Sequence, residues 1–134
     1  MNSSTTTLLN SEMAKSETHN SYLDMVDHPA HVKKLTVKQL EQLAKELRVE
    51  LIEGLAQNGG HLGPNLGVVE LTVAMHRVFE TPKDKFVWDV SHQSYVHKLL
   101  TGRKNRFRTI RTTDGSIRFV VKPNPKQHGL FHLP

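Results

Sequence analysis

The sequence predicts an α/β domain that is rich in helix and contains one short strand. Two observations predict the helices, and a third predicts the strand. Apolar side chains recur every three or four residues from Leu40 to Leu55, which is the pattern of an amphipathic helix. A second apolar run over residues 68–79 is long enough for another helix. Residues 86–90 (FVWDV) form an apolar run short enough for a buried strand of a parallel sheet.

The composition is that of an ordinary globular domain. The 134 residues are 37% hydrophobic and 23% charged and suit one domain. Cysteine is absent, which excludes disulfides, thiolate nucleophiles and cysteine-ligated zinc. No apolar run approaches the ~18 residues of a membrane span, so we expect no membrane partner. Residues 1–20 are rich in Ser, Thr and Asn and hold few apolar side chains, which predicts a disordered tail. They lack the apolar run of a secretory signal and the arginines of a transit peptide, so we expect a cytoplasmic location.

The positive charge is concentrated in the second part of the chain. Residues 1–60 carry 6 Lys and Arg against 8 Asp and Glu, a net charge of −2, whereas residues 61–134 carry 12 against 5, a net charge of +7. Much of this excess lies between Arg103 and Arg111. Such a patch can attract nucleic acid. The plainer reading is a solvated basic loop, and because no aromatic stacking platform accompanies the arginines, we expect no nucleic-acid partner.

The signals at the helix ends define the order of the elements. Thr36 and Gln39 have the spacing of a capping box, and the glycines after Asn58 end the first long helix. Residues 59–67 (GGHLGPNLG) hold four glycines and one proline in nine positions, which predicts a loop without regular structure.

The later elements follow from apolar content. The helix over 68–79 is apolar on nearly every side, so we expect it to be buried on most of its faces. The strand over 86–90 leads through a turn at 91–94 into a short helix over 95–100, with Gly102 as its C-cap. Residues 117–121 could form one edge strand, and residues 122–134 are expected to be irregular.

Two histidines are candidate functional residues. His92 follows the predicted strand, and the carboxyl end of a strand is where open α/β sheets bind ligands. His61 lies among glycines, which leave room for a ligand beside its imidazole. On the residues alone, a histidine that only bonds backbone is the commoner outcome for His61.

The other histidines favour structural roles. His92 and His97 are five residues apart, whereas two metal ligands on one helix face need a spacing of three or four. No carboxylate cluster completes a coordination shell, so we expect no metal site. His76 on the apolar helix is interpreted as a hydrogen-bonded structural histidine, and His97 as a packed or surface residue.

The run from Leu35 to Ile110 resembles the amino-terminal part of the 1-deoxy-D-xylulose-5-phosphate synthase family. The resemblance covers roughly 75 positions and rests on several uncommon residues in order. The matching blocks are Gly59-Gly60-His61-Leu62-Gly63, Leu66-Gly67-Val68-Val69-Glu70-Leu71-Thr72, Val78-Phe79, Thr81-Pro82, Asp84-Lys85, Trp88-Asp89-Val90-Ser91-His92-Gln93, Tyr95, His97-Lys98, Leu100-Thr101-Gly102-Arg103 and Thr109-Ile110-Arg111.

The resemblance implies a thiamine-diphosphate and magnesium enzyme that joins pyruvate to glyceraldehyde 3-phosphate with loss of carbon dioxide, and that acts as a homodimer. It implies that His61 is catalytic and assists proton transfer, a task suited to imidazole. It implies that His92 contacts the cofactor. Residues 21–115 would then be part of the pyrophosphate-type thiamine-diphosphate-binding domain.

The chain departs from the family pattern in several places. Ser91, Ser94 and Val96 replace the usual glycine, alanine and proline, and Ser91 adds a hydroxymethyl group near the cofactor. The family's Gly-Asp-Gly…Asn motif, which holds the metal and the diphosphate, is absent from the sequence. A one-base frameshift within 122–132 would yield a stretch closer to the family, a hypothesis that the nucleotide sequence decides.

These departures predict a fragment of the synthase that is inactive alone and binds neither thiamine diphosphate nor magnesium by itself. The alternative is a non-catalytic fragment that docks onto a full-length synthase or a complementing chain.

Overall fold

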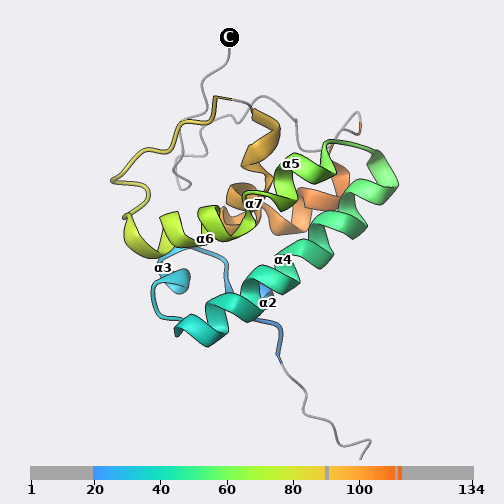
Figure 1. Ribbon diagram of the computed structural model, residues 1–134. Helices are drawn as coiled ribbons and strands as arrows, with labels where there is room; N and C mark the ends of the chain where they lie inside the picture. The colour runs from blue at the N-terminus through green and yellow to red at the C-terminus, as the bar shows by residue number, and fades with distance from the viewer. Residues whose placement is uncertain (1–19, 90, 111, 113–134) are drawn as a thin grey trace, which may run out of the picture.

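A computed structural model describes residues 20–89, 91–110 and 112, and within them the structure is built of helices (Figure 1). The predicted disordered tail over 1–20 lies outside these residues except for residue 20, and the predicted features beyond residue 115 lie outside them entirely. No helix in the described ranges is long and apolar enough to cross a membrane. The helical elements are α2 (Tyr22–Met25), α3 (Pro29–Val32), α4 (Val37–Asn58), α5 (Leu62–Leu66), α6 (Val69–Val78), η1 (Ser91–Ser94), α7 (Tyr95–Lys98), η2 (Leu99–Arg103) and η3 (Lys104–Thr109).

The long helix α4 begins and ends where the sequence predicts. The Gln39 amide donates to the Thr36 hydroxyl over 3.4 Å, and the Thr36 amide donates to the Gln39 side chain over 2.8 Å, so the capping box is confirmed. After Asn58 the chain turns at Gly59, whose φ of 70° favours glycine. One stripe of α4 is buried, formed by Leu43, Ala44, Leu47, Leu51, Gly54 and Leu55.

The prediction that the glycine-rich segment 59–67 has no regular structure is wrong in part, because the segment contains the short helix α5. Pro64 is the third residue of this helix. A proline is tolerated there because the first-turn amides of a helix have no acceptor within the helix. From α5 the chain continues into α6, and the two run back along α4 (Figure 1).

Helix α6 forms as predicted, but the prediction that it is buried on most faces is wrong. Val69 and Val73 are buried, whereas Val78 is 71% exposed and Leu71 is 59% exposed. The buried side packs on α4 and α3. Among the described residues, no further layer covers the opposite side.

The predicted strand over 86–90 is not observed in residues 86–89, which have no regular secondary structure, and Val90 lies outside the described residues. A strand needs a neighbouring strand to bond its amides and carbonyls. The described part of the chain offers none. The α/β class and its parallel strand are therefore not seen here, and the described part is helix-rich.

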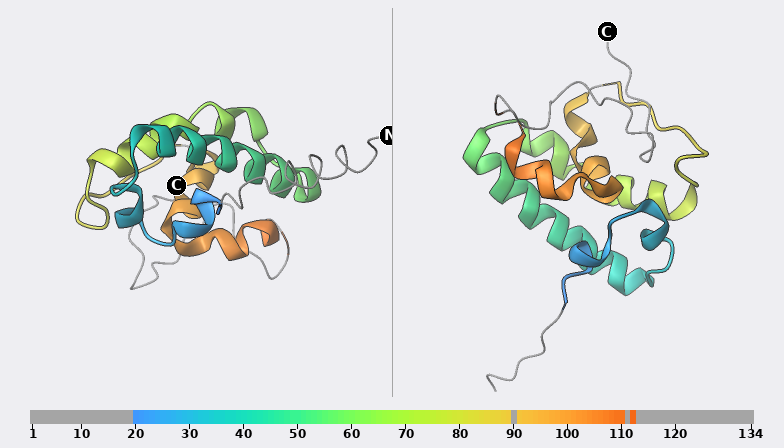
Figure 2. Two further views of the ribbon diagram at one scale, coloured as in Figure 1. Left: turned by 90° about the horizontal axis from the view of Figure 1, so that it is seen from below. Right: turned by 180° about the vertical axis from the view of Figure 1, so that it is seen from behind.

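The last helices close the core. Helix α7 ends at Lys98 and continues directly into η2, where the backbone leaves the helical conformation at Thr101 and at Gly102, whose φ is 77°. This left-handed position agrees with the predicted C-cap. Seen from below, α4 lies with α5 and α6 in one layer, and α2 lies with η2 and η3 in the other (Figure 2). The core between them includes Leu47, Leu51, Tyr95, Leu99, Leu100, Phe107 and Ile110.

Candidate functional site

The structure brings the two predicted site histidines together. His61 precedes α5 at its N-cap position, and His92 lies in η1. Their rings are stacked, with centroids 4.4 Å apart and an interplanar angle of 28°. His61 is exposed and His92 is half-buried. The pair therefore presents imidazole to solvent, where a small molecule can reach it.

Asn65 fixes the backbone at His61. Its side-chain amide donates to the His61 carbonyl over 2.7 Å, within the turn that begins α5. Asn65 is fully buried, and its Oδ1 atom has no hydrogen-bond partner among the described residues. We did not predict this residue, although an asparagine four positions after a histidine in a glycine-rich segment is a detectable signal for such a local bond.

A buried cluster on α6 and α7 supports the turn that carries His92. His76 Nε2 lies 2.9 Å from His97 Nδ1, and one of these nitrogens donates to the other. The Thr81 hydroxyl lies 3.2 Å from His76 Nδ1. The His97 ring also packs against Trp88, with centroids 4.5 Å apart. Trp88 precedes η1 and His97 follows it, so the contact between their rings joins the two ends of the turn that carries His92.

Burial keeps these two histidines neutral. Both are 0% exposed. Desolvation, followed by the nearby charge of Lys33, lowers the pKa of His76 to about 4. Desolvation, followed by repulsion from His76, Arg103 and Lys98, lowers the pKa of His97 well below its ordinary value. The structural reading of His76 is confirmed, and His97 is packed in the core.

Lys98 is a buried cation next to this cluster, and sequence reasoning missed it. It is 2% exposed, and its Nζ atom lies 5.5 Å from the centroid of the Tyr95 ring. Burial, followed by repulsion from Arg103, lowers its pKa to about 8. A lysine in an amphipathic helix ordinarily faces water, so no pattern in the sequence distinguishes this one.

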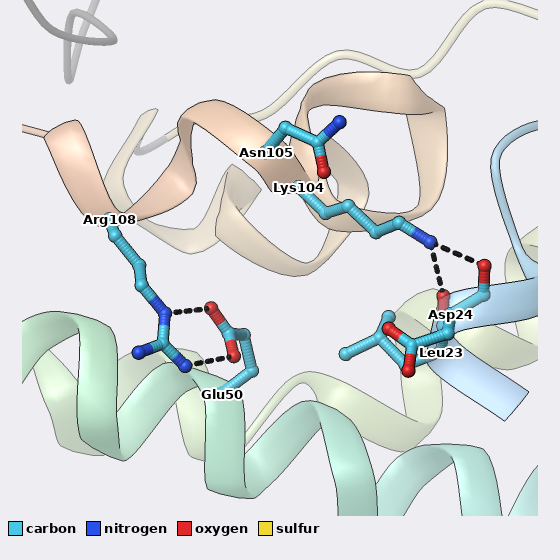
Figure 3. A pocket seen from close by; sticks show the side chains of 6 residues that line it. All are labelled: Leu23, Asp24, Glu50, Lys104, Asn105 and Arg108. Atoms are coloured by element: carbon cyan, nitrogen blue, oxygen red, sulfur yellow. Dashed lines mark hydrogen bonds and ion pairs between the residues drawn. The ribbon is translucent and has the colours of Figure 1, made fainter. Parts of the chain in front are cut away.

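Two cations of the basic stretch bind other parts of the chain. Lys104 Nζ donates to the carbonyls of Leu23 and Asp24 over 2.8 and 2.7 Å (Figure 3). Arg108 donates to both carboxylate oxygens of Glu50, over 3.2 and 3.0 Å (Figure 3). These contacts line a pocket of about 210 Å³. Its charged groups neutralise one another, so the pocket offers no excess charge to a ligand.

The described residues do not fit the metal and diphosphate part of a thiamine-diphosphate site. They contain no group of three or more His, Cys, Asp or Glu side chains that could hold a metal ion. A diphosphate with its magnesium needs oxygen ligands and neutralising charge. The stacked histidines supply neither oxygen ligands nor neutralising charge.

Comparison with known proteins identifies the family. The family model described as 1-deoxy-D-xylulose-5-phosphate synthase matches residues 23–132. The synthase of Methylacidiphilum infernorum is 62% identical over 100 residues, which cover 75% of this chain and 16% of that protein. The synthase of Acidobacterium capsulatum is 58% identical over 106 residues, or 79% of this chain and 17% of that protein.

A plant relative shows the same partial coverage. The probable chloroplastic synthase 2 of Oryza sativa subsp. japonica is 56% identical over 109 residues, which cover 81% of this chain and 15% of that protein. The chain thus spans about a sixth of the length of the curated relatives it matches. On the extent of the family match and these identities, the chain belongs to the 1-deoxy-D-xylulose-5-phosphate synthase family.

Proposed function

We propose that this chain provides the histidine-bearing part of a 1-deoxy-D-xylulose-5-phosphate synthase active site and is inactive alone. The observation that carries the proposal is the stacking of His61 on His92 at the surface, 4.4 Å between centroids. The reaction joins pyruvate to glyceraldehyde 3-phosphate and releases carbon dioxide. When bound by a complete synthase, thiamine diphosphate supplies the carbanion chemistry of this reaction.

His61 is proposed as the group that moves a proton on or off the reacting oxygen. Its exposed ring can reach a substrate, and an imidazole can both accept and donate a proton. Asn65 positions it by holding its carbonyl at 2.7 Å. His92 is proposed to contact the cofactor, and its ring limits how the His61 ring can turn.

The metal and diphosphate ligands are proposed to come from other parts of a synthase, because the described residues hold no suitable cluster. Segment 86–89 is proposed to pair with later strands there, which would restore the α/β sheet of the complete domain. This accounts for a described region that carries the histidines of the site without a cluster of metal-binding carboxylates.

A chimeric synthase tests the proposal. This chain would replace the matching region of the Methylacidiphilum infernorum synthase, to which it is 62% identical. We expect product formation from pyruvate and glyceraldehyde 3-phosphate with thiamine diphosphate and magnesium. His61→Ala should lower kcat by about 100-fold or more. A folded chimera whose activity is unchanged by that substitution would contradict the role of His61.

Inactivity of the isolated chain is tested by calorimetry. Thiamine diphosphate titrated into the chain with magnesium present should give no binding heat. Binding of thiamine diphosphate with a micromolar Kd would contradict this part of the proposal.

A further inference from the structure

We propose that the apolar groove between α4 and α6 binds an amphipathic helix from the part of a synthase that lies beyond the region matched by this chain. This inference rests on the proposed function, because it takes the partner from a synthase. The groove encloses about 240 Å³. It is lined by Val37, Leu40, Glu41 and Ala44 of α4 and by Glu70, Val73, Ala74, Arg77 and Val78 of α6.

The spacing of the lining residues favours a helix as the occupant. Those on α4 recur at three- and four-residue intervals, and so do those on α6. Two neighbouring helices that each present such a ridge form a groove complementary to a third helix. Val37 is 72% exposed and Val78 is 71% exposed, so docking would remove both from water.

Both helices of the groove are held in place without a ligand. Arg48 of α4 forms an ion pair with Glu70 of α6 and donates to the Leu66 carbonyl over 3.2 Å. Lys33 donates to the Arg77 and Val78 carbonyls over 3.3 and 3.2 Å, at the end of α6. A partner therefore meets a preformed surface, which lowers the entropic cost of binding.

Charge on the two walls specifies the partner further. Glu41 stands on the α4 wall and Arg77 on the α6 wall, and neither side chain has an ion pair within the described ranges. A matching helix carries an apolar stripe with a basic residue on the flank facing α4 and an acidic residue on the flank facing α6. Such flanking charges fix the orientation of the helix.

The synthase beyond this region is favoured over a second copy. A twofold contact between identical copies must be self-complementary, and a groove facing a groove leaves a void between its walls. The relatives continue for more than four fifths of their length outside the matched region, since the chain covers only 15–17% of them. That length is long enough to supply the layer that this inference places over α6.

Binding of the full chain to synthetic peptides tests this inference. Overlapping peptides of about 20 residues would cover the Methylacidiphilum infernorum synthase outside the matched region, with fluorescence anisotropy as the readout. We expect one peptide, or adjoining ones, with an amphipathic helical pattern to bind with a Kd on the order of 1–100 μM. Val78→Asp should raise this Kd at least about tenfold. Val49→Asp is the matched control, because Val49 is 54% exposed on α4 but does not line the groove, and it should change the Kd less than about twofold.

A charge exchange sharpens the test. Arg77→Glu should weaken binding of the same peptide, and replacing the peptide's acidic residue by lysine should restore that binding. Circular dichroism would verify that each variant is folded. The inference is overturned if no peptide binds better than its scrambled version or if Val78→Asp binds as tightly as the parent. It is also overturned if sedimentation shows that the parent chain is a dimer and that Val78→Asp dissociates it while Val49→Asp does not. In that case the occupant is a second copy. Activity of the chimeric synthase is measured separately, so failure of the groove and failure of the proposed function are distinguishable.

Discussion

The described part of the protein contains two stacked pairs of histidines in opposite environments. His76 and His97 have ring centroids 5.0 Å apart and are both 0% exposed, whereas His61 and His92 are 4.4 Å apart and lie at the surface. The first pair bonds through its ring nitrogens and joins α6 to α7. The second pair joins α5 to η1 and presents imidazole to solvent. The same side chain thus supports the fold in one place and is available for chemistry in the other, and burial makes the difference.

Removing one histidine from each pair should show the largest difference in stability between them. His97→Ala should lower the free energy of unfolding by about 2–4 kcal/mol, because it leaves a cavity and an unbonded buried nitrogen on His76. His61→Ala should change it by less than about 0.5 kcal/mol. Urea unfolding followed by circular dichroism measures both. Equal losses in the two variants would show that the pairs do not differ as described.

Lowering the pH should destabilise the folded chain through the buried pair, His76 and His97. Its pKa values are lowered by burial, so the unfolded chain binds protons below about pH 6.5 that the folded chain does not. Stability is therefore retained above pH 6.5 and falls as the pH drops toward about 4, by on the order of 2–3 kcal/mol from His76 alone, and His97 adds to this loss. Lys33, Lys98 and Arg103 add repulsion against a charged pair. Urea titrations between pH 7 and 4.5 measure the slope, and His76→Gln should reduce it. A flat profile in the parent chain would rule out a neutral buried pair.

Two glycines extend the comparison to packing. A Cβ added at Gly54 would lie 2.6 Å from Cε1 of Phe107 in the core, whereas one added at Gly63 in α5 meets nothing within 4 Å. Gly54→Ala should cost about 1–3 kcal/mol, because the Phe107 ring must move. Gly63→Ala should change stability by less than about 1 kcal/mol. Thermal unfolding distinguishes them, and a loss at position 63 as large as that at position 54 would contradict an open surface around α5.

The N-terminal ends of helices α4 and α5 should show the smallest of these differences in stability. Thr36 caps α4, whereas the side chain of His61 makes no capping bond at the start of α5. Thr36→Ala should therefore cost about 1 kcal/mol. Lys38→Ala, one position inside the same helix, serves as the control and should cost little. Urea unfolding of the two variants checks this. An unchanged free energy of unfolding in Thr36→Ala would show that the capping box does not stabilise the fold.

The sequence allowed the local features of this fold to be predicted. The ends of α4 follow from Thr36 and the glycines after Asn58, and the two site histidines follow from the family motif around them. Features that depend on distant contacts escaped prediction. The burial of Lys98, the pairing of His76 with His97 and the exposed side of α6 each depend on which helix lies opposite. The strand predicted over 86–90 has no partner among the described residues, so its apolar pattern alone could not decide its structure.

Chemical modification of the histidines tests the contrast between the two pairs most directly. The folded chain would be treated with diethyl pyrocarbonate, and each imidazole quantified by mass spectrometry, with a sample in urea as the reference. We expect His61 to react in the folded chain, and His76 and His97 to react only in urea. A folded chain in which His61 is protected, or in which His76 and His97 react as fast as His61, would contradict this expectation.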